Sequence, residues 1–232
     1  LLKNETDMGM SSRRIKEKER EELLPSTGDL TLPGSEHVLG LDGLAIITSP
    51  SNSVSSLTMD QLVAIFSGEF TNWSQPGGKD LPIKIYARDE KSGTWDTFKS
   101  LVLETRKAKL SESATRVESS SELSDSVARE AGAIGFIGLP YVRHAKLIAV
   151  ASADHNKAIM PTHFTVGTED YPLSRRLFFY TPQVNPNIEA KEFIRFVKSL
   201  KPKVVVLENV SGMKSTGDFV KTIEKDLSLA GN

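Results

Sequence analysis

The hydrophobic and polar positions along the chain switch between two periodicities. Short apolar runs, such as 44–47 and 133–137, predict strands that are buried on both faces of a sheet. Between such runs, apolar residues recur at helical spacing on one face, as in 186–200. Strands that alternate with helices predict an α/β fold with mostly parallel sheets. We expect strands at 7–10, 44–47, 81–86, 133–137, 145–150, 173–180 and 204–207, and helices at 16–22, 58–67, 96–104, 122–130, 186–200 and 219–229.

Individual residues mark the ends of two of these helices. Thr58 and Gln61 fit a capping box at the start of one helix, and Gly68 follows as its terminator. Gly132 is expected to be the left-handed residue that ends the helix at 122–130.

The stretch 87–98 carries the most informative chemistry, because it joins an expected strand to an expected helix. Ser92, Gly93 and Thr94 stand at the start of the helix, and Arg88 precedes them by four residues. The first N–H groups of a helix lack intrahelical partners, and the helix dipole places partial positive charge there. Glycine allows a ligand to approach the backbone, and arginine offers a planar, charged fork. This turn therefore predicts a binding site for a tetrahedral oxyanion.

Simpler interpretations of these residues remain open. Serine and threonine are ordinary N-caps, and an arginine such as Arg88 is often a solvated surface residue. Asp7, at the edge of a short strand beside Gly9, is a turn former or a ligand. Trp73 is interpreted as a packing anchor.

Composition narrows the classes of function. The 232 residues carry 29 basic and 30 acidic side chains, and this net charge of −1 argues against a nucleic-acid partner. Cysteine is absent, which excludes disulfides and thiolate metal sites. The absence suits an exported protein but leaves the compartment open. No apolar run approaches the ~18 residues of a membrane span, and no signal peptide is recognisable. We therefore do not expect the chain to span a membrane.

The four histidines argue against metal binding and against histidine-based catalysis. They occur singly, at His37, His144, His155 and His163, without a paired ligand or a triad spacing. No metal, cofactor or catalytic residue is expected.

Several short motifs follow one another over about residues 5 to 200, and together they are specific. In this order the chain resembles the phosphate-binding subunit of ABC transporters, the substrate-binding protein of phosphate import. The motifs are DMGMSSR at 7–13, DGLAII at 42–47, LTMDQL at 57–62 with IFSG at 65–68 and TNW at 71–73, RDEKSGT at 88–94, GAIGF at 132–136 and YPLSR at 171–175.

The resemblance implies a two-lobed, periplasmic-binding-protein-like fold of type II, with mixed, mostly parallel sheets and the ligand in an interlobe cleft. Lobe one is expected to comprise 1–49 and 145–232, and lobe two 50–144 with the anion turn. The segments 49–53 and 145–150 would then cross between the lobes.

The resemblance also implies roles for individual residues. In this family the aspartate of the first motif accepts a hydrogen bond from phosphate, and the arginine and the Ser-Gly-Thr turn bind its oxygens. A carboxylate acceptor favours protonated phosphate over fully ionised sulfate, which has no proton to donate. The expected ligand-binding residues are Asp7, Ser11, Arg88, Ser92, Gly93 and Thr94.

A protein of this kind binds inorganic phosphate, delivers it to a membrane permease and is not an enzyme. We expect it to be exported to the periplasm or the cell surface, and to be a monomer. Family members begin with a further strand and helix whose first loop supplies more phosphate contacts. We expect either that truncation or natural processing removed this part or that the protein lacks half of its site. Lys91 and Trp95 also depart from the family pattern, as does the part of the chain after Leu200.

Three other functions are compatible with the same fold or with the same turn at 87–98. The first is an adhesive or structural surface protein with a degenerate site, and the second is a binder of molybdate, sulfate or an organic phosphate. The third is an enzyme with Ser92 as a nucleophile, which lacks a nearby base.

Overall fold

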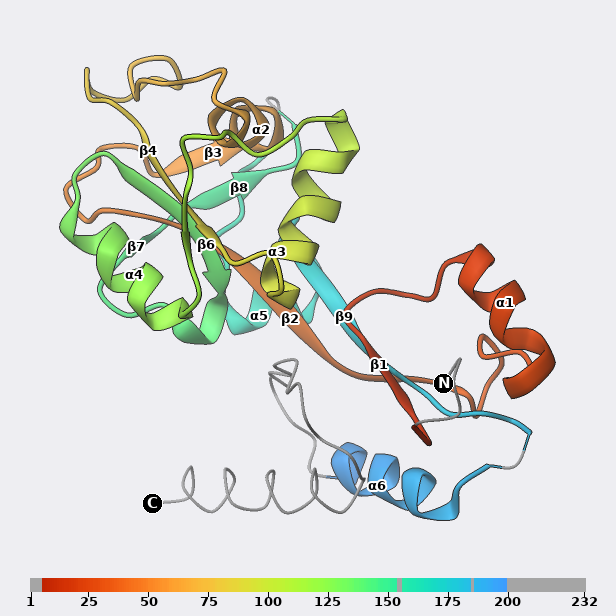
Figure 1. Cartoon of the computed structure of the whole chain (residues 1–232). Helices are drawn as coiled ribbons and strands as arrows, with labels where there is room; N and C mark the ends of the chain where they lie inside the picture. Colours follow the sequence, from red (N-terminus) through yellow and green to blue (C-terminus); the bar gives the residue numbers. More distant parts are fainter. Residues whose placement is uncertain (1–5, 154–155, 185, 200–232) are drawn as a thin grey trace. The chain divides into compact units, whose positions relative to one another are not determined.

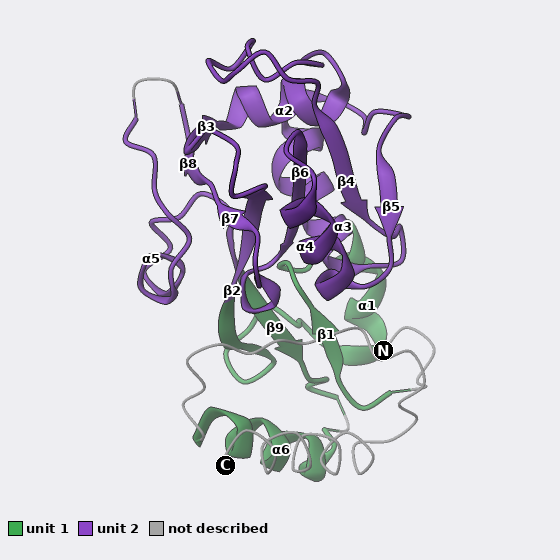
Figure 2. Ribbon diagram, turned by 90° about the vertical axis from the view of Figure 1, so that its left-hand side faces the viewer, with its two compact units in different colours: residues 1–41, 176–232 green, residues 42–175 purple. Residues whose placement is uncertain are grey.

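The computed structural model describes residues 6–153, 156–184 and 186–199, so the strand expected at 204–207 and the helix expected at 219–229 lie outside the described residues. The chain forms two compact units, which Figure 2 colours separately. Their boundaries fall inside two strands, β2 (Glu36–Thr48) and β9 (Ser174–Tyr180). The first unit is Leu1–Leu41 with Arg176–Asn232, and the second is Asp42–Arg175.

In the first unit, residues of β9 belong to two small hydrophobic cores. Figure 1 shows the path of this strand. The strand β1 (Gly9–Ser11) pairs antiparallel with β9. Successive side chains of a strand point to opposite faces. Phe179 therefore packs against α6 (Ile188–Ser199), whereas Phe178 and Tyr180 pack on the side of α1 (Glu17–Thr27). The helices expected at 16–22 and 186–200 are confirmed as α1 and α6.

Tyr180 makes the first unit sensitive to alkaline pH. Its side chain is buried, and its hydroxyl accepts a hydrogen bond from the Ile15 N–H at 3.0 Å. Burial raises the pKa of Tyr180 from 10.0 to about 12. Its contribution to folding stability is therefore fully present below pH 10 and is lost as the pH rises to about 12.

We predict that Tyr180→Phe, which cannot ionise, reduces the loss of thermal stability over that alkaline range. Melting curves of both proteins at increasing pH measure the effect. Equal slopes in the two proteins would contradict the assignment.

The second unit is built on a mixed sheet and a separate strand pair. β2 pairs antiparallel with β6 (Ala133–Gly138) and with β7 (Lys146–Leu147). Parallel pairs join β6 to β4 (Lys84–Arg88) and β4 to β5 (Thr115–Val117). β3 (Ser56–Thr58) pairs parallel with β8 (Ala149–Ala151). The predicted α/β class with mixed sheets is confirmed: the pairs of β4 and of β3 are parallel, and those of β2 with β6 and β7 are antiparallel.

Helices cover both faces of this sheet, as Figure 1 shows. On one face, Leu123 and Val127 of α4 (Ser120–Arg129) pack against the sheet, and a Cβ on Gly135 would lie 2.7 Å from Leu123. On the other face, the Phe136 ring lies 3.9 Å from Phe98 of α3 (Gly93–Phe98) and 5.6 Å from Phe66 of α2 (Met59–Ser67), measured between centroids. The alternation along β6 thus separates the two layers.

The helix-end predictions have mixed outcomes. Thr58 caps α2 in a capping box with Gln61, and Gly68 ends α2 in the left-handed conformation, as predicted. The role predicted for Gly132 is wrong, because α4 ends at an extended Glu130 and Gly132 has no positive φ. Glycine is required there for a different reason, since a Cβ would overlap the Pro82 carbonyl oxygen.

The unit boundaries differ from the division expected at 49/50 and 144/145. Residues 44–48 pair with β6, and β8 pairs with β3, so these segments belong to the second unit.

The strand expected at 145–150 is two short strands, β7 and β8. The assignment of lobes remains a prediction. The short helix α5 (His163–Gly167) was not predicted.

Candidate anion-binding site

The connection from β4 to α3 is a compact turn in the second unit. Asp89 organises it, because its carbonyl accepts the Ser92 N–H at 3.0 Å and its carboxylate accepts the Lys91 N–H at 2.9 Å. Ser92 is the N-cap of α3, and its hydroxyl oxygen accepts the Thr94 N–H at 3.2 Å. The helix therefore begins at Gly93, three residues before the predicted start, and it continues into a π-helical turn at Lys99–Leu103.

Gly93 leaves one side of this turn open. A Cβ built on Gly93 would meet no atom within 4 Å. Its carbonyl accepts hydrogen bonds from the Thr97 hydroxyl at 2.7 Å and from Nη1 of Arg175 at 3.2 Å. An anion can approach the backbone closely only where no side chain stands, and the turn provides such a position.

Arg88, at the end of β4, is buried and only 8% exposed. Its Nη1 donates to the Ser120 hydroxyl, and its Nη2 donates to the Glu118 carbonyl at 2.7 Å. These bonds orient the guanidinium from the start of α4. The sequence did not predict these two partners, because they follow a different strand.

Asp7 and Ser11 lie in the first unit, where Asp7 precedes β1 by two residues and Ser11 is its last residue. Asp7 is exposed, and the Ser11 hydroxyl accepts the Arg13 N–H at 3.3 Å. The structure thus brings Arg88, Ser92, Gly93 and Thr94 together in one turn of the second unit, whereas Asp7 and Ser11 belong to the first unit.

An ion pair that the sequence did not predict contacts the turn. Nε and Nη2 of Arg175 donate to Oδ2 of Asp42 at 2.9 and 2.6 Å. The two side chains are only 12% and 11% exposed. Asp42 begins the DGLAII motif, and Arg175 ends the YPLSR motif. A single charged residue next to a buried strand indicates that the charge is paired, but the sequence does not show with which residue.

A second arginine, Arg116 of β5, also contacts the turn. It donates to the Arg88 carbonyl, forms an ion pair with Glu90 and lies over the ring of Trp95. Trp73, by contrast, is the packing residue that was predicted: it is buried, and its indole N–H donates to the Gly132 carbonyl at 2.9 Å.

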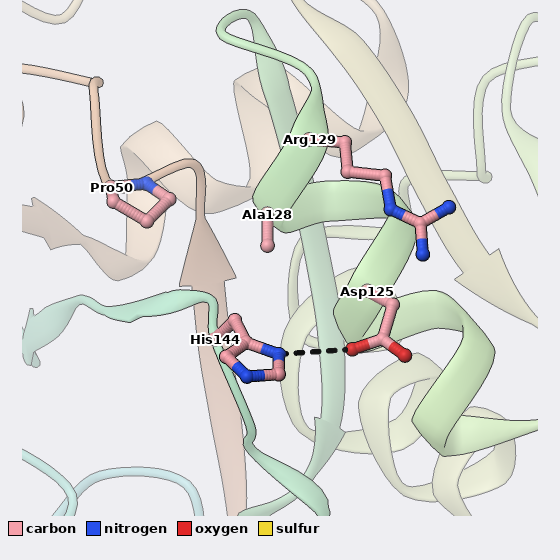
Figure 3. Close-up of a pocket in the computed structure, with 5 residues that line it drawn as sticks. All are labelled: Pro50, Asp125, Ala128, Arg129 and His144. Carbon is pink, nitrogen blue, oxygen red and sulfur yellow. Dashed lines mark hydrogen bonds and ion pairs between the residues drawn. The ribbon is translucent and has the colours of Figure 1, made fainter.

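A separate pocket lies beside α4 and contains none of the predicted ligand residues (Figure 3). Pro50, Asp125, Ala128, Arg129 and His144 line it. Nδ1 of His144 lies 3.4 Å from Oδ1 of Asp125, and Arg143 lies 3.2 Å from the other carboxylate oxygen. Within the described parts of the chain there is no group of three or more potential metal-ligating side chains. None of the described helices has both the length and the apolar character needed to cross a membrane.

Comparisons with known proteins identify the family. The model of the PBP superfamily domain matches residues 1–200. The crystal structure of an ABC-type phosphate transport receptor from Vibrio cholerae is similar, with 33% identity and a TM-score of 0.69, over 84% of this chain and 75% of the receptor. The chain belongs to the family of phosphate-binding proteins of ABC transporters. The predicted two-lobed fold class is thereby confirmed.

Two curated relatives extend the comparison. The phosphate-binding protein PstS of Bacillus subtilis is 31% identical over 79% of this chain and 60% of its own length. The PstS protein of Borreliella burgdorferi is 29% identical over 75% of this chain and 63% of its own length. The chain thus spans less than two thirds of the length of these relatives.

Proposed function

We propose that this chain binds inorganic phosphate as the substrate-binding component of an ABC-type phosphate importer. The observation that carries the proposal is the open turn between β4 and α3, with a buried arginine at its start and a glycine that leaves the backbone accessible. The names of the related receptor and PstS proteins favour phosphate as the ligand.

Each residue of the turn has a physical role in this proposal. Arg88 neutralises the charge of the anion, and its orientation by Ser120 and Glu118 lowers the entropic cost of binding. Ser92 and Thr94 donate hydrogen bonds to phosphate oxygens, and Gly93 permits their approach to the backbone.

The proposal also includes Asp7 and Ser11 of the first unit as ligand-binding residues. Asp7 accepts a hydrogen bond from protonated phosphate, and the Ser11 hydroxyl donates a hydrogen bond to a phosphate oxygen. The proposal further includes export to the periplasm or the cell surface, a monomeric protein and delivery of phosphate to a membrane permease. The named relatives are binding proteins and transport receptors, which supports a function other than catalysis.

Calorimetric titration with phosphate, with sulfate as the matched anion, tests the proposal. Titrations on either side of the second ionisation of phosphate separate the two protonation states. We expect phosphate to bind and sulfate to bind far more weakly. Equal binding of the two anions would favour a general oxyanion site, and no binding of either would contradict the proposal for this chain.

The selectivity assigned to Asp7 gives a specific prediction. Asp7→Asn removes the negative charge and adds N–H donors, so it should reduce the preference for phosphate over sulfate. The ratio of the two dissociation constants measures the effect. Glu22→Gln, which neutralises an exposed carboxylate of α1, is the control and should leave the ratio unchanged.

A further inference from the structure

Arg116 contacts three separate parts of the β4-to-α3 turn. It lies in the middle of β5, opposite Ala87 of β4. Nη1 donates to the Arg88 carbonyl at 2.8 Å, and Nη2 lies 3.1 Å from Oε1 of Glu90. The guanidinium carbon lies 4.4 Å from the centroid of the Trp95 ring. One side chain therefore links the start, the middle and the helical end of the turn.

We propose that Arg116 is a positioning residue that holds the turn of Arg88–Thr94 in the conformation that binds an anion. This inference rests on the proposed function and assigns to Arg116 no contact with the anion itself. It also gives a role to the contact between Arg116 and Trp95.

The geometry of the guanidinium explains why arginine fits this position. Its face stacks on an aromatic ring while N–H groups at its edge donate in the guanidinium plane. Trp95 provides a firm base for this contact, because its indole is 8% exposed and lies beside Phe136, with a centroid distance of 6.2 Å. Glu90 is exposed, and its side chain contacts Arg116 from the middle of the turn.

If Arg116 positions the turn, replacing it with lysine should have a different effect on phosphate affinity than if only its positive charge matters. Lysine keeps the positive charge but lacks the planar fork, so it cannot make the stacking contact and both polar contacts together. If Arg116 acted through its charge, Arg116→Lys would retain phosphate affinity. If it acts by positioning, Arg116→Lys lowers the affinity, and Glu90→Gln produces a smaller change of the same direction.

The experiment compares the wild type with Arg116→Lys, Glu90→Gln and the control Arg106→Lys. Arg106 forms an exposed ion pair with Asp60 in the same unit, away from the turn in sequence. Backbone amide shifts of residues 90–94 and the tryptophan emission are measured without ligand, and phosphate affinity is measured by calorimetry. The chain has two tryptophans, so the emission responds strongly to a change around Trp95.

For Arg116→Lys we expect shifted amides at 90–94, altered emission and an affinity about tenfold weaker. Arg106→Lys should change none of these. Unchanged amides in Arg116→Lys would overturn the proposal, and so would shifted amides with unchanged phosphate affinity. If the wild type failed to bind phosphate, the proposed function would be wrong, and the ligand-free amide shifts would still decide whether Arg116 positions the turn.

Discussion

Arg88→Ala is expected to weaken phosphate binding by about a hundredfold or more, because truncating a buried charged donor removes both charge and hydrogen bonds from the ligand. Arg88 is 8% exposed, and its guanidinium is oriented by Ser120 and by the Glu118 carbonyl. Water and flexible side chains cannot easily replace a donor that is fixed in this way. Calorimetric titration with phosphate measures the loss.

Two further variants separate the loss of the ligand contact from a loss of structure. Arg106→Ala removes an exposed arginine of the same unit and should leave the affinity unchanged. Ser120→Ala removes one partner that orients Arg88, so it should weaken binding less than Arg88→Ala. If Arg88→Ala folded normally and bound phosphate as tightly as the wild type, Arg88 would have no role in the site.

The largest effect on stability is expected at the ion pair of Asp42 and Arg175. Asp42→Ala leaves the Arg175 charge in a site where the side chain is only 12% exposed. Removing one partner of such a buried pair should lower the free energy of unfolding by about 3 kcal/mol or more. Urea denaturation of the wild type and the variant measures the difference.

The exposed pair of Asp60 and Arg106 provides the control, because its side chains are 60% and 50% exposed. Asp60→Ala should cost less than about 1 kcal/mol. The double variant Asp42→Leu with Arg175→Met should recover part of the lost stability, since it leaves no unpaired charge. Equal costs for Asp42→Ala and Asp60→Ala would contradict the account of the buried pair.

The sequence predicted helices and strands well where neighbouring residues alone determine them. The capping box of Thr58 and the left-handed Gly68 define α2, as predicted. The apolar run at 44–47 identified β2 but not its full length, Glu36–Thr48. Its first part is only partly buried, so it lacks the continuous apolar character that marks the second part.

The turn itself was predictable because its residues are contiguous in the sequence. The charged residues that contact the turn were not predictable, because they come from other strands. The Asp42 to Arg175 bond joins residues that are 133 positions apart, and Arg116 reaches the turn from the strand next to β4. Only the sheet pairing brings these charges to the turn, and no local periodicity encodes that pairing. The two compact units also depend on this pairing, since it places 44–48 and β8 in the second unit. The division into lobes expected at 49/50 and 144/145 remains a prediction.

A titration of the isotope-labelled protein with phosphate, followed by backbone amide shifts, tests the central claim most directly. We expect the amide chemical shifts of Gly93 and Thr94 to change strongly and saturably with phosphate. Sulfate at the same concentrations should leave them nearly unchanged. Saturable binding of phosphate that leaves both amides unmoved would contradict the assignment of the turn between β4 and α3 as the phosphate site.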